Sequence, residues 1–237
     1  MQAPAFRPRI ARGLKKIYDA LFRAYGRQHW WPGNSRFEIM AGAVLTQNTA
    51  WINVERAIAN LKNANRLSPK AIIGAHPKSL AYWLKPSGYF NVKSRRLRAL
   101  CRWILEQGGL GRLARIPTKR LREMLLSVNG IGPESADDIL LYAFNRPVFV
   151  IDAYTRRLFS RLEIVRGDED YEVLRNMFEF NLERGTKLFN EFHALIVHHA
   201  KHICQPRPRC DQCCLSKQCR YRNGQNAQPL RSKTGRG

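Results

Sequence analysis

Acidic residues are scarce in this chain of 237 residues. Its 18 Asp and Glu stand against 41 Lys and Arg, so the formal net charge is +23. A surplus of this size favours a polyanionic partner, because binding releases counterions from phosphates and long-range attraction speeds the encounter. A merely soluble basic protein, or a ribosome-associated one, would carry a similar charge. Nucleic acid is the favoured partner, but the charge does not say which nucleic acid or what is done to it.

Long apolar runs are also missing. No stretch approaches the roughly 20 apolar residues of a membrane-spanning helix, and residues 1–26 hold no continuous apolar core of a secretory signal. We therefore expect no membrane association and a reducing compartment: the cytoplasm of a bacterium or archaeon, near the nucleoid, or the nucleus or an organelle if the source is eukaryotic. In such a compartment the six cysteines are not expected to form disulfides.

Strand patterns are nearly absent as well. Apolar residues recur with three- and four-residue spacing between Pro, Gly and polar breaks, which predicts a nearly all-helical body. Val148–Ile151 is apolar and β-branched, but no second strand is available to pair with it, so we expect a buried connector. The predicted helices cover 10–22, 37–45, 51–61, 93–107, 121–126 and 135–144.

The C-terminal part continues this pattern. Asp152 is a suitable N-cap for a helix that runs to about Val165. A last long helix is expected at about Asn190–His202. After Tyr221 the composition turns to Asn, Gln, Gly, Ser, Lys and Arg, which predicts a disordered basic tail over 222–237.

The most distinctive motif is the turn Gly130-Ile131-Gly132 between the helices at 121–126 and 135–144. Glycines lack a Cβ, so the backbone can approach a phosphate closely. The helix that follows offers unpaired N–H groups and the positive end of its dipole. Taken alone, such a turn is more often a simple connection between two helices.

The chain resembles the helix-hairpin-helix DNA glycosylases of the endonuclease III superfamily over nearly its whole length. The matching segments lie in order along the chain: Phe37-Glu38, Val44–Thr49, Ser87–Asn91 with Lys93, Gly130–Ala136, Val150–Asp152 and a four-cysteine tail.

This resemblance implies an all-α, bilobed fold. A six-helix barrel lobe would span 34–144, with the helix-hairpin-helix at about 121–144. The second lobe would combine 1–33 with 145–221, and would carry the cysteine loop at 204–219. Duplex DNA would bind with its damaged nucleotide flipped out, because the glycosidic carbon is inaccessible inside the stack.

Asp152 matches the catalytic aspartate of the superfamily. Breaking an N-glycosidic bond builds positive, oxocarbenium-like charge on the sugar. A fixed carboxylate can stabilise this charge, or orient or deprotonate the attacking water. The residues alone favour a simple N-cap, whereas the resemblance favours catalysis. Both roles are compatible.

Glu134 departs from the pattern of the bifunctional members, which have a lysine at this position. That lysine forms a Schiff base with the sugar and permits strand cleavage, and a carboxylate cannot do so. The departure predicts a monofunctional enzyme. Ala43 stands where the adenine-mismatch branch has a catalytic glutamate, which argues against that branch.

The segment His29–Gly33 and the three motifs around residues 45, 85 and 130 look most like the 3-methyladenine glycosylase III branch. In that branch a Trp-Pro pair, here Trp31 and Pro32, stacks on the flipped purine, and an aromatic face attracts a cationic alkylated base. Trp30 is assigned equally to the pocket or to the core. The expected base pocket is Trp31, Pro32, Trp30 and Glu134.

The resemblance also implies a set of DNA contacts. Gln47 and Asn48 occupy the turn from which relatives insert a polar wedge into the vacated stack, and Tyr89 stands where a second wedge enters the opposite strand. In a turn, Asn and Gln are otherwise unremarkable. The expected DNA-binding residues are Gly130, Ile131, Gly132, Gln47, Asn48, Tyr89 and Lys93.

Four cysteines lie close together near the C-terminus, with five, two and five residues between them. Such thiolates in a reducing compartment indicate a metal site, for which structural zinc is the commoner answer. The resemblance instead implies a [4Fe–4S] cluster. Cys214 could replace Cys213, because the first gap is one residue shorter than usual. The expected ligands are Cys204, Cys210, Cys213 and Cys219.

The cysteine tail is typical of endonuclease III, whereas the 3-methyladenine III branch lacks it. We therefore predict a monomeric, monofunctional glycosylase that excises damaged, alkylated bases from duplex DNA. The alternatives are a mismatch thymine or uracil glycosylase, an oxidised-pyrimidine glycosylase with or without lyase activity, and a non-catalytic protein that recognises DNA structure.

Overall fold

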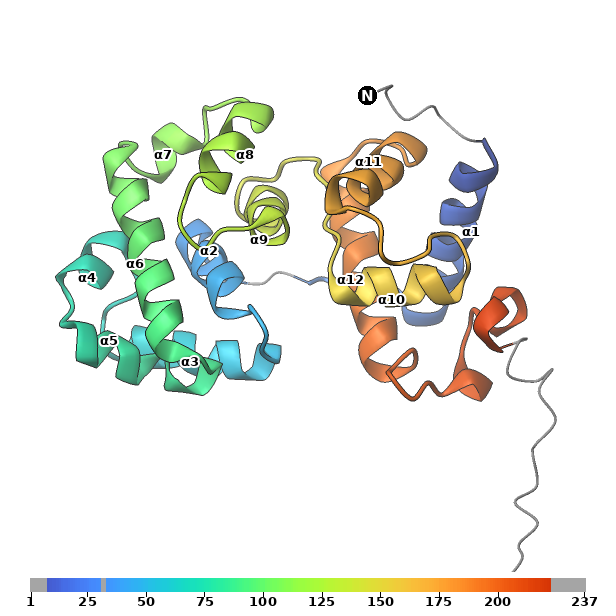
Figure 1. Ribbon diagram of the computed structural model, residues 1–237, viewed down its shortest axis with the longest axis horizontal. Coiled ribbons are helices and arrows are strands. Elements are labelled where there is room, and N and C mark those ends of the chain that lie inside the picture. Colours follow the sequence, from blue (N-terminus) through green and yellow to red (C-terminus); the bar gives the residue numbers. More distant parts are fainter. Residues whose placement is uncertain (1–7, 31–32, 223–237) are drawn as a thin grey trace, which may run out of the picture. The chain divides into compact units, whose positions relative to one another are not determined.

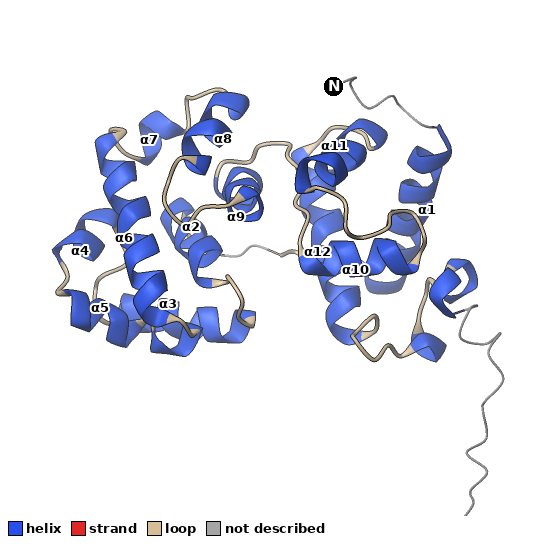
Figure 2. Cartoon of the chain, in the orientation of Figure 1, coloured by secondary structure: helices blue, strands red, loops and turns tan. Residues whose placement is uncertain are grey.

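The computed structural model describes residues 8–30 and 33–222. These residues form helices and turns and contain no strand, in agreement with the predicted all-α class (Figure 2). They divide into two compact units. The hairpin unit holds the described residues within Trp30–Val150 and Gly185–Asn190, and the cysteine unit holds those within Met1–His29, Ile151–Arg184 and Glu191–Gly237. Beyond Arg222, the predicted basic tail lies outside the described residues.

Helix α2 (Arg36–Leu45) is the core of the hairpin unit. Every residue from Phe37 to Leu45 is buried, as expected of a helix that is apolar all round. Ser35 caps its first turn by accepting a hydrogen bond from the Glu38 N–H at 3.1 Å. Four elements pack against α2: α3 (Trp51–Asn63), α6 (Phe90–Glu106), α9 (Pro133–Asp138) and η2 (Ile139–Ala143).

Short helices complete this unit, and the sequence marks where they start. Helix α4 (Pro69–Gly74) and α5 (Pro77–Trp83) each have proline in the first turn, where a missing N–H costs nothing. They are capped by Ser68 and His76. The 3₁₀ turn η1 (Lys85–Ser87), α7 (Leu110–Leu113) and α8 (Thr118–Leu126) follow in chain order (Figure 1).

The segment after α9 differs from a regular helix. η2 is a π-helical turn, and it ends where Asn145 adopts a left-handed φ of 52°. Val148–Ile151 forms no strand and is at most 2% exposed, so the prediction of a buried connector is confirmed.

The cysteine unit is built from α1 (Pro8–Tyr25), α10 (Ala153–Arg161), α11 (Tyr171–Asn181) and the part of α12 (Thr186–His202) from Glu191 onward. Its core is aromatic: the Phe159 ring meets Phe178 edge-on at 4.8 Å and Phe192 at 6.2 Å between centroids. Such edge-to-face pairs stabilise a core beyond their buried area. No helix within the described ranges is long and apolar enough to span a membrane.

Two predicted helix limits in the C-terminal part of the chain are wrong by about four residues. Helix α10 ends at Arg161 rather than near Val165, because Glu163 turns left-handed at φ 55° and Ile164 N–H bonds back to Phe159 O. This is a terminating motif that requires no glycine. Helix α12 begins at Thr186, before the expected Asn190.

Candidate active site and cysteine loop

Asp152 closes the buried connector and caps α10. Its Oδ1 accepts hydrogen bonds from Thr155 N–H at 2.7 Å and Thr155 Oγ1 at 2.8 Å. The predicted N-cap is therefore confirmed. The side chain is 13% exposed, so it is largely but not completely buried.

His193 on α12 lies on the other side of this carboxylate. Its Nε2 stands 3.4 Å from Asp152 Oδ2, and its side chain is 3% exposed. Burial alone would raise the pKa of Asp152, but the charge and hydrogen bonding of His193 and the two donors of Thr155 outweigh it and hold the pKa below its ordinary value of 3.8. Asp152 is thus ionised at neutral pH.

The glycine turn of the hairpin unit has two different glycines. Gly130 has φ +87°, and a Cβ there would overlap the Arg96 side chain at Cγ and Cδ. Gly132 has an ordinary φ of −91°, and a Cβ there would meet nothing within 4 Å. Gly130 is needed by the fold, whereas Gly132 leaves open space before the first turn of α9.

Ile131 anchors the turn from within. Its side chain is 5% exposed, and its N–H donates to Val128 O at 3.0 Å. That N–H is therefore engaged inside the protein. A backbone contact from Ile131 to a DNA phosphate, which the resemblance led us to expect, would require this bond to open.

A buried ion pair joins the two helices of the hairpin. Arg122 on α8 donates to both oxygens of Asp137 on α9, from Nε at 2.7 Å and from Nη2 at 3.1 Å. Asp137 is fully buried. Bidentate pairing fixes the relative orientation of two elements as well as neutralising the charge. The sequence analysis missed this pair.

Gln47 ties the loop after α2 to the hairpin. Its Nε2 donates to Gly130 O at 2.9 Å and to Ser135 Oγ at 3.0 Å, and its Oε1 accepts from Arg96. A side chain held by three bonds is poorly placed to act as a wedge. The expected wedge role of Gln47 therefore conflicts with its structural role.

Asn48 and Tyr89 have the opposite character. Both are exposed, Tyr89 by 72%, and both have positive φ, 54° and 43°. A left-handed aromatic residue is a genuine backbone outlier, and such strain concentrates at functional sites. Their geometry suits side chains that meet a ligand.

Lys93 corrects one expectation. It is 1% exposed, and its Nζ donates to Leu45 O at 2.9 Å and Ser87 O at 2.6 Å. Burial, with a smaller contribution from Arg96, lowers its pKa from 10.5 to about 8. The expected contact with DNA is wrong for this side chain, because it is buried and its Nζ donates hydrogen bonds to two backbone carbonyls. It fastens the two loops that carry Asn48 and Tyr89.

The expected base pocket is described only in part. Trp31 and Pro32 lie outside the described residues. Trp30 is half-buried, with its ring edge-on to Trp51 at 6.4 Å and to Tyr142 at 5.2 Å. Glu134 is exposed on the first turn of α9, where the helix dipole favours an acid.

The four predicted cysteine ligands line one small cavity in the cysteine unit. Cys214 does not line this cavity; it is exposed, and its Sγ lies 3.9 Å from the Tyr25 hydroxyl. Among the described side chains, no three Cys, His, Asp or Glu are arranged to hold a single metal ion.

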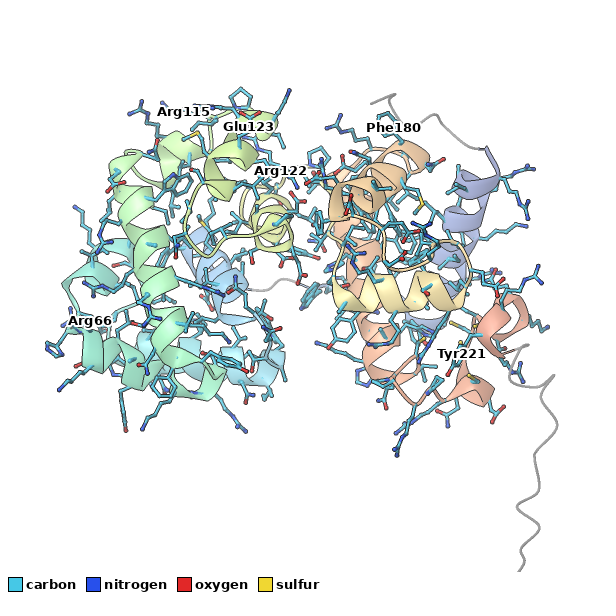
Figure 3. All side chains as sticks on the ribbon, in the orientation of Figure 1. Arg66, Arg115, Arg122, Glu123, Phe180 and Tyr221 are labelled. Carbon is cyan, nitrogen blue, oxygen red and sulfur yellow. The ribbon has the colours of Figure 1, made fainter. Side chains whose placement is uncertain are left out.

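Two arginines of α10 hold the cysteine loop by its backbone. Arg157 donates to Ala200 O and Cys204 O, and Arg161 donates to Cys204 O, Gln205 O and Pro206 O at 2.6–3.3 Å. The Arg161 guanidinium also lies 3.2 Å from Cys204 Sγ and 4.7 Å from the ring centroid of Tyr221 (Figure 3).

The fold and the hairpin place the chain among known proteins. Residues 41–184 match the model of the HhH-GPD superfamily of base excision DNA repair proteins. The chain belongs to this family. It is accordingly a DNA glycosylase of the HhH-GPD family, which is the coarse function that the sequence predicted.

Relatives of this HhH-GPD protein match it over most of their length. MJ1434 of Methanocaldococcus jannaschii, which bears a provisional name as a DNA repair glycosylase, is 43% identical over 212 residues, 86% of this chain and 96% of its own. Endonuclease III of Thermotoga maritima is 26% identical over 227 residues, 94% of this chain and 100% of its own.

Solved structures agree. The 3-methyladenine DNA glycosylase of H. pylori, bound to 1,N6-ethenoadenine, is 33% identical with a TM-score of 0.67, covering 83% of this chain and 98% of that one. A non-covalent endonuclease III–DNA complex gives a TM-score of 0.80 at 18% identity, covering 92% and 99%. At that identity the second likeness concerns the fold alone.

Proposed function

We propose that this HhH-GPD protein is a monofunctional glycosylase that releases alkylated, 3-methyladenine-like purines from duplex DNA and leaves the abasic strand intact. The observation that carries the proposal is the exposed Glu134 on the first turn of α9. The bifunctional pattern requires an amine there, and a carboxylate cannot form the Schiff base that precedes strand cleavage.

Lys93 is the lysine with a pKa lowered toward the range of a nucleophile, to about 8. It is nevertheless buried, and both Leu45 O and Ser87 O hold its nitrogen. A nucleophile must reach the sugar, so Lys93 does not substitute for the amine missing at 134.

Asp152 supplies the charge in this proposal. A general base is most effective when its pKa lies near the working pH, and the pKa of Asp152 is lowered below 3.8. Its carboxylate is better suited to stabilise developing positive charge than to remove a proton from water. This suits an alkylated purine, which is already a cationic leaving group and needs no general acid.

Trp30 and the neighbouring Trp31 and Pro32 form the base pocket in this proposal. An aromatic face attracts a cationic base, and Trp30 is already held edge-on by Trp51 and Tyr142. The 33% identical H. pylori glycosylase was solved with an ethenoadenine, a modified purine, which supports a purine here too.

The cysteine loop, in the same proposal, holds a [4Fe–4S] cluster through Cys204, Cys210, Cys213 and Cys219. The donor set fits, because four thiols line one cavity. Four thiols also suit a structural zinc ion, and the likeness to endonuclease III favours the cluster. When bound, the cluster cross-links the loop; this chain's own Arg157 and Arg161 hold the loop to α10.

The proposed protein acts as a monomer on genomic DNA in the cytoplasm of a prokaryotic cell. Its contacts with DNA are assigned to the space before Gly132, to Asn48 and to Tyr89. The space beside Gly132, before the first turn of α9, can admit a phosphate. Asn48 and Tyr89, which are exposed and left-handed, are the residues that would insert into the base stack.

Purified full-length protein, incubated with duplexes that carry single defined lesions, tests the proposal. The lesions are a stable 3-methyladenine analogue, 1,N6-ethenoadenine, uracil, thymine opposite guanine, and an oxidised pyrimidine. We expect strand breaks only after hot alkali, only at the alkylated purines, and not with Asp152→Asn. Alkali-independent breaks, or covalent trapping by borohydride, would overturn the monofunctional assignment.

Two further variants sharpen the experiment. Glu134→Lys restores the amine of the bifunctional pattern, so it should give borohydride-trapped product where wild type gives none. Release of thymine or uracil in preference to purines would promote the mismatch alternative. Tight binding without release of any base would promote the non-catalytic alternative.

A further inference from the structure

Asp152 is held by groups from two separate helices. Thr155, one turn along α10, occupies Oδ1 with two donors at 2.7 and 2.8 Å. His193, on α12, places Nε2 at 3.4 Å from Oδ2. Both Thr155 and His193 are buried, at 1% and 3% exposure. The first contact is local to the cap, whereas the second depends on how α12 packs against α10.

The chemistry of this pair fixes the direction of the contact. A carboxylate is acceptor-only, with about four lone-pair sites on its two oxygens. The ring nitrogen that faces Oδ2 must therefore carry its proton, because two lone pairs would repel each other. Two sites are filled by Thr155 and a third faces His193. One remains for the sugar or the attacking water.

We propose that His193 is a positioning residue for Asp152: its Nε2–H holds Oδ2, so that the carboxylate stays ionised and its plane stays fixed while charge develops on the sugar. Both oxygens turn together about the Cβ–Cγ bond, so the cap bonds at Oδ1 and a donor at Oδ2 restrict the same rotation from opposite sides of the carboxylate. This proposal rests on the proposed catalytic role of Asp152.

The separation of 3.4 Å exceeds the 2.7–3.2 Å of a well-formed N–H···O bond, and Nε2 and Oδ2 are not in hydrogen-bond geometry in this structure. Catalytic hydrogen bonds are often long in free enzymes and tighten on binding. Thr155 from α10 and His193 from α12 act on the carboxylate. The Tyr171 hydroxyl of α11 accepts from the N–H of Ile151, the residue before Asp152, at 3.3 Å.

Two substitutions separate positioning from simple packing. His193→Phe keeps a planar ring of similar size and removes the donor. His193→Gln keeps an N–H donor at about the reach of Nε2 and removes the ring. His198→Phe serves as a matched control, since His198 is on the same helix and its ring contacts Tyr25 and His202 instead of Asp152.

Single-turnover release of the alkylated base is measured beside the Kd for the same duplex. We expect His193→Phe to slow release by about 10- to 100-fold, the size of one hydrogen bond to a charged group, and to leave Kd within about twofold. His193→Gln should recover most of the rate, and His198→Phe should match wild type. Equal losses in His193→Phe and His193→Gln, or no loss in either, would overturn the proposal.

A second measurement needs no substrate. The pKa of Asp152, followed by its ¹³C-carboxyl shift, should rise in His193→Phe and return toward the wild-type value in His193→Gln. An unchanged pKa would refute the contact even if wild type proved to release no base, so failure of the proposed function is distinguishable from failure of this inference. If His193→Phe does not fold, His193→Asn replaces it, because its shorter side chain does not reach Oδ2.

Discussion

The glycine hairpin and the cysteine loop obtain their order from different sources. Contacts within the protein hold the hairpin in place. A buried ion pair joins α8 to α9, and Gln47, in the loop after α2, donates hydrogen bonds to Gly130 in the turn and to Ser135 in α9. The regular structure of the cysteine loop consists of two 3₁₀ turns, η3 (Cys210–Gln212) and η4 (Ser216–Gln218). No residue within either turn is buried. It is held by arginine side chains at its start and encloses a thiol-lined cavity.

This difference teaches where each region is vulnerable. The hairpin should survive removal of any bound group and fail when one of its internal partners is changed. The loop should tolerate many surface changes and fail when the group that fills its cavity is lost. Four predictions test this contrast, from the largest expected effect to the smallest.

Cys213→Ser should abolish the bound group and give the largest loss of stability. The free energy of metal binding contributes to folding, by about 10–16 kcal/mol for structural zinc in small peptides. Iron, sulfide and zinc contents and the urea unfolding curve are the measurements. Cys214→Ser is the control, because Cys214 does not line the cavity; equal loss of metal in both variants would contradict the ligand assignment.

Arg122→Leu should destabilise the hairpin unit by about 3–5 kcal/mol, because it removes the bidentate partner of a fully buried carboxylate. Arg120→Leu, on the same helix, removes an exposed pair with Glu123 at 3.4 Å and should cost at most about 1 kcal/mol. Urea unfolding gives both values. Similar values for the two variants would show that the Arg122 pair does not brace the hairpin.

Lys93 predicts a rise of stability with pH. Its pKa falls from 10.5 unfolded to about 8 folded, so the unfolded chain binds more protons between these values and stability increases as the pH rises from 8 to 10.5. The gain is at most about 3 kcal/mol at about 1.4 kcal/mol per pKa unit. Lys93→Met should flatten this part of the curve, and an unchanged slope would show that Lys93 is not the group responsible.

Gly130→Ala and Gly132→Ala should have separable effects. The first forces an L-residue into φ +87° against Arg96, which should cost about 1–2 kcal/mol of stability or more. The second meets no neighbour within 4 Å, so it should leave stability nearly unchanged and weaken DNA binding by filling the approach to α9. Unfolding curves and Kd for duplex DNA, measured on both variants, decide between these patterns.

Local pattern was sufficient for much of the fold. Apolar spacing placed the helices, and Asp152 was correctly identified as a cap because capping depends on a residue three positions away. Glycine and proline marked most helix ends. The end of α10 was not predicted, because the left-handed residue that terminates it is Glu163 and not glycine or asparagine, the residues that usually signal such an end.

Partners distant in sequence were not predicted. Lys93 was predicted to contact DNA as an ordinary charged residue. Its spacing from Leu97 and Leu100 nevertheless places it on the buried face of α6. His193 lies within an apolar run, and Asp137 lies on the buried face of the hairpin helix. A charged or polar residue on an apolar stripe is the signal that could have found all three. Their partners depend on tertiary packing, which no local pattern contains.

Asp152 caps the start of helix α10, and the two arginines that bind the cysteine loop, Arg157 and Arg161, lie in the second half of the same helix. Nine residues of helix span about 14 Å, so the carboxylate and the cysteine loop lie at opposite ends of one short helix. Both ends are held from outside the helix, by His193 at one and by the loop carbonyls at the other. Under the proposed function, we therefore expect loss of the group bound by the cysteines to disturb the position of the Asp152 carboxylate as well as the loop.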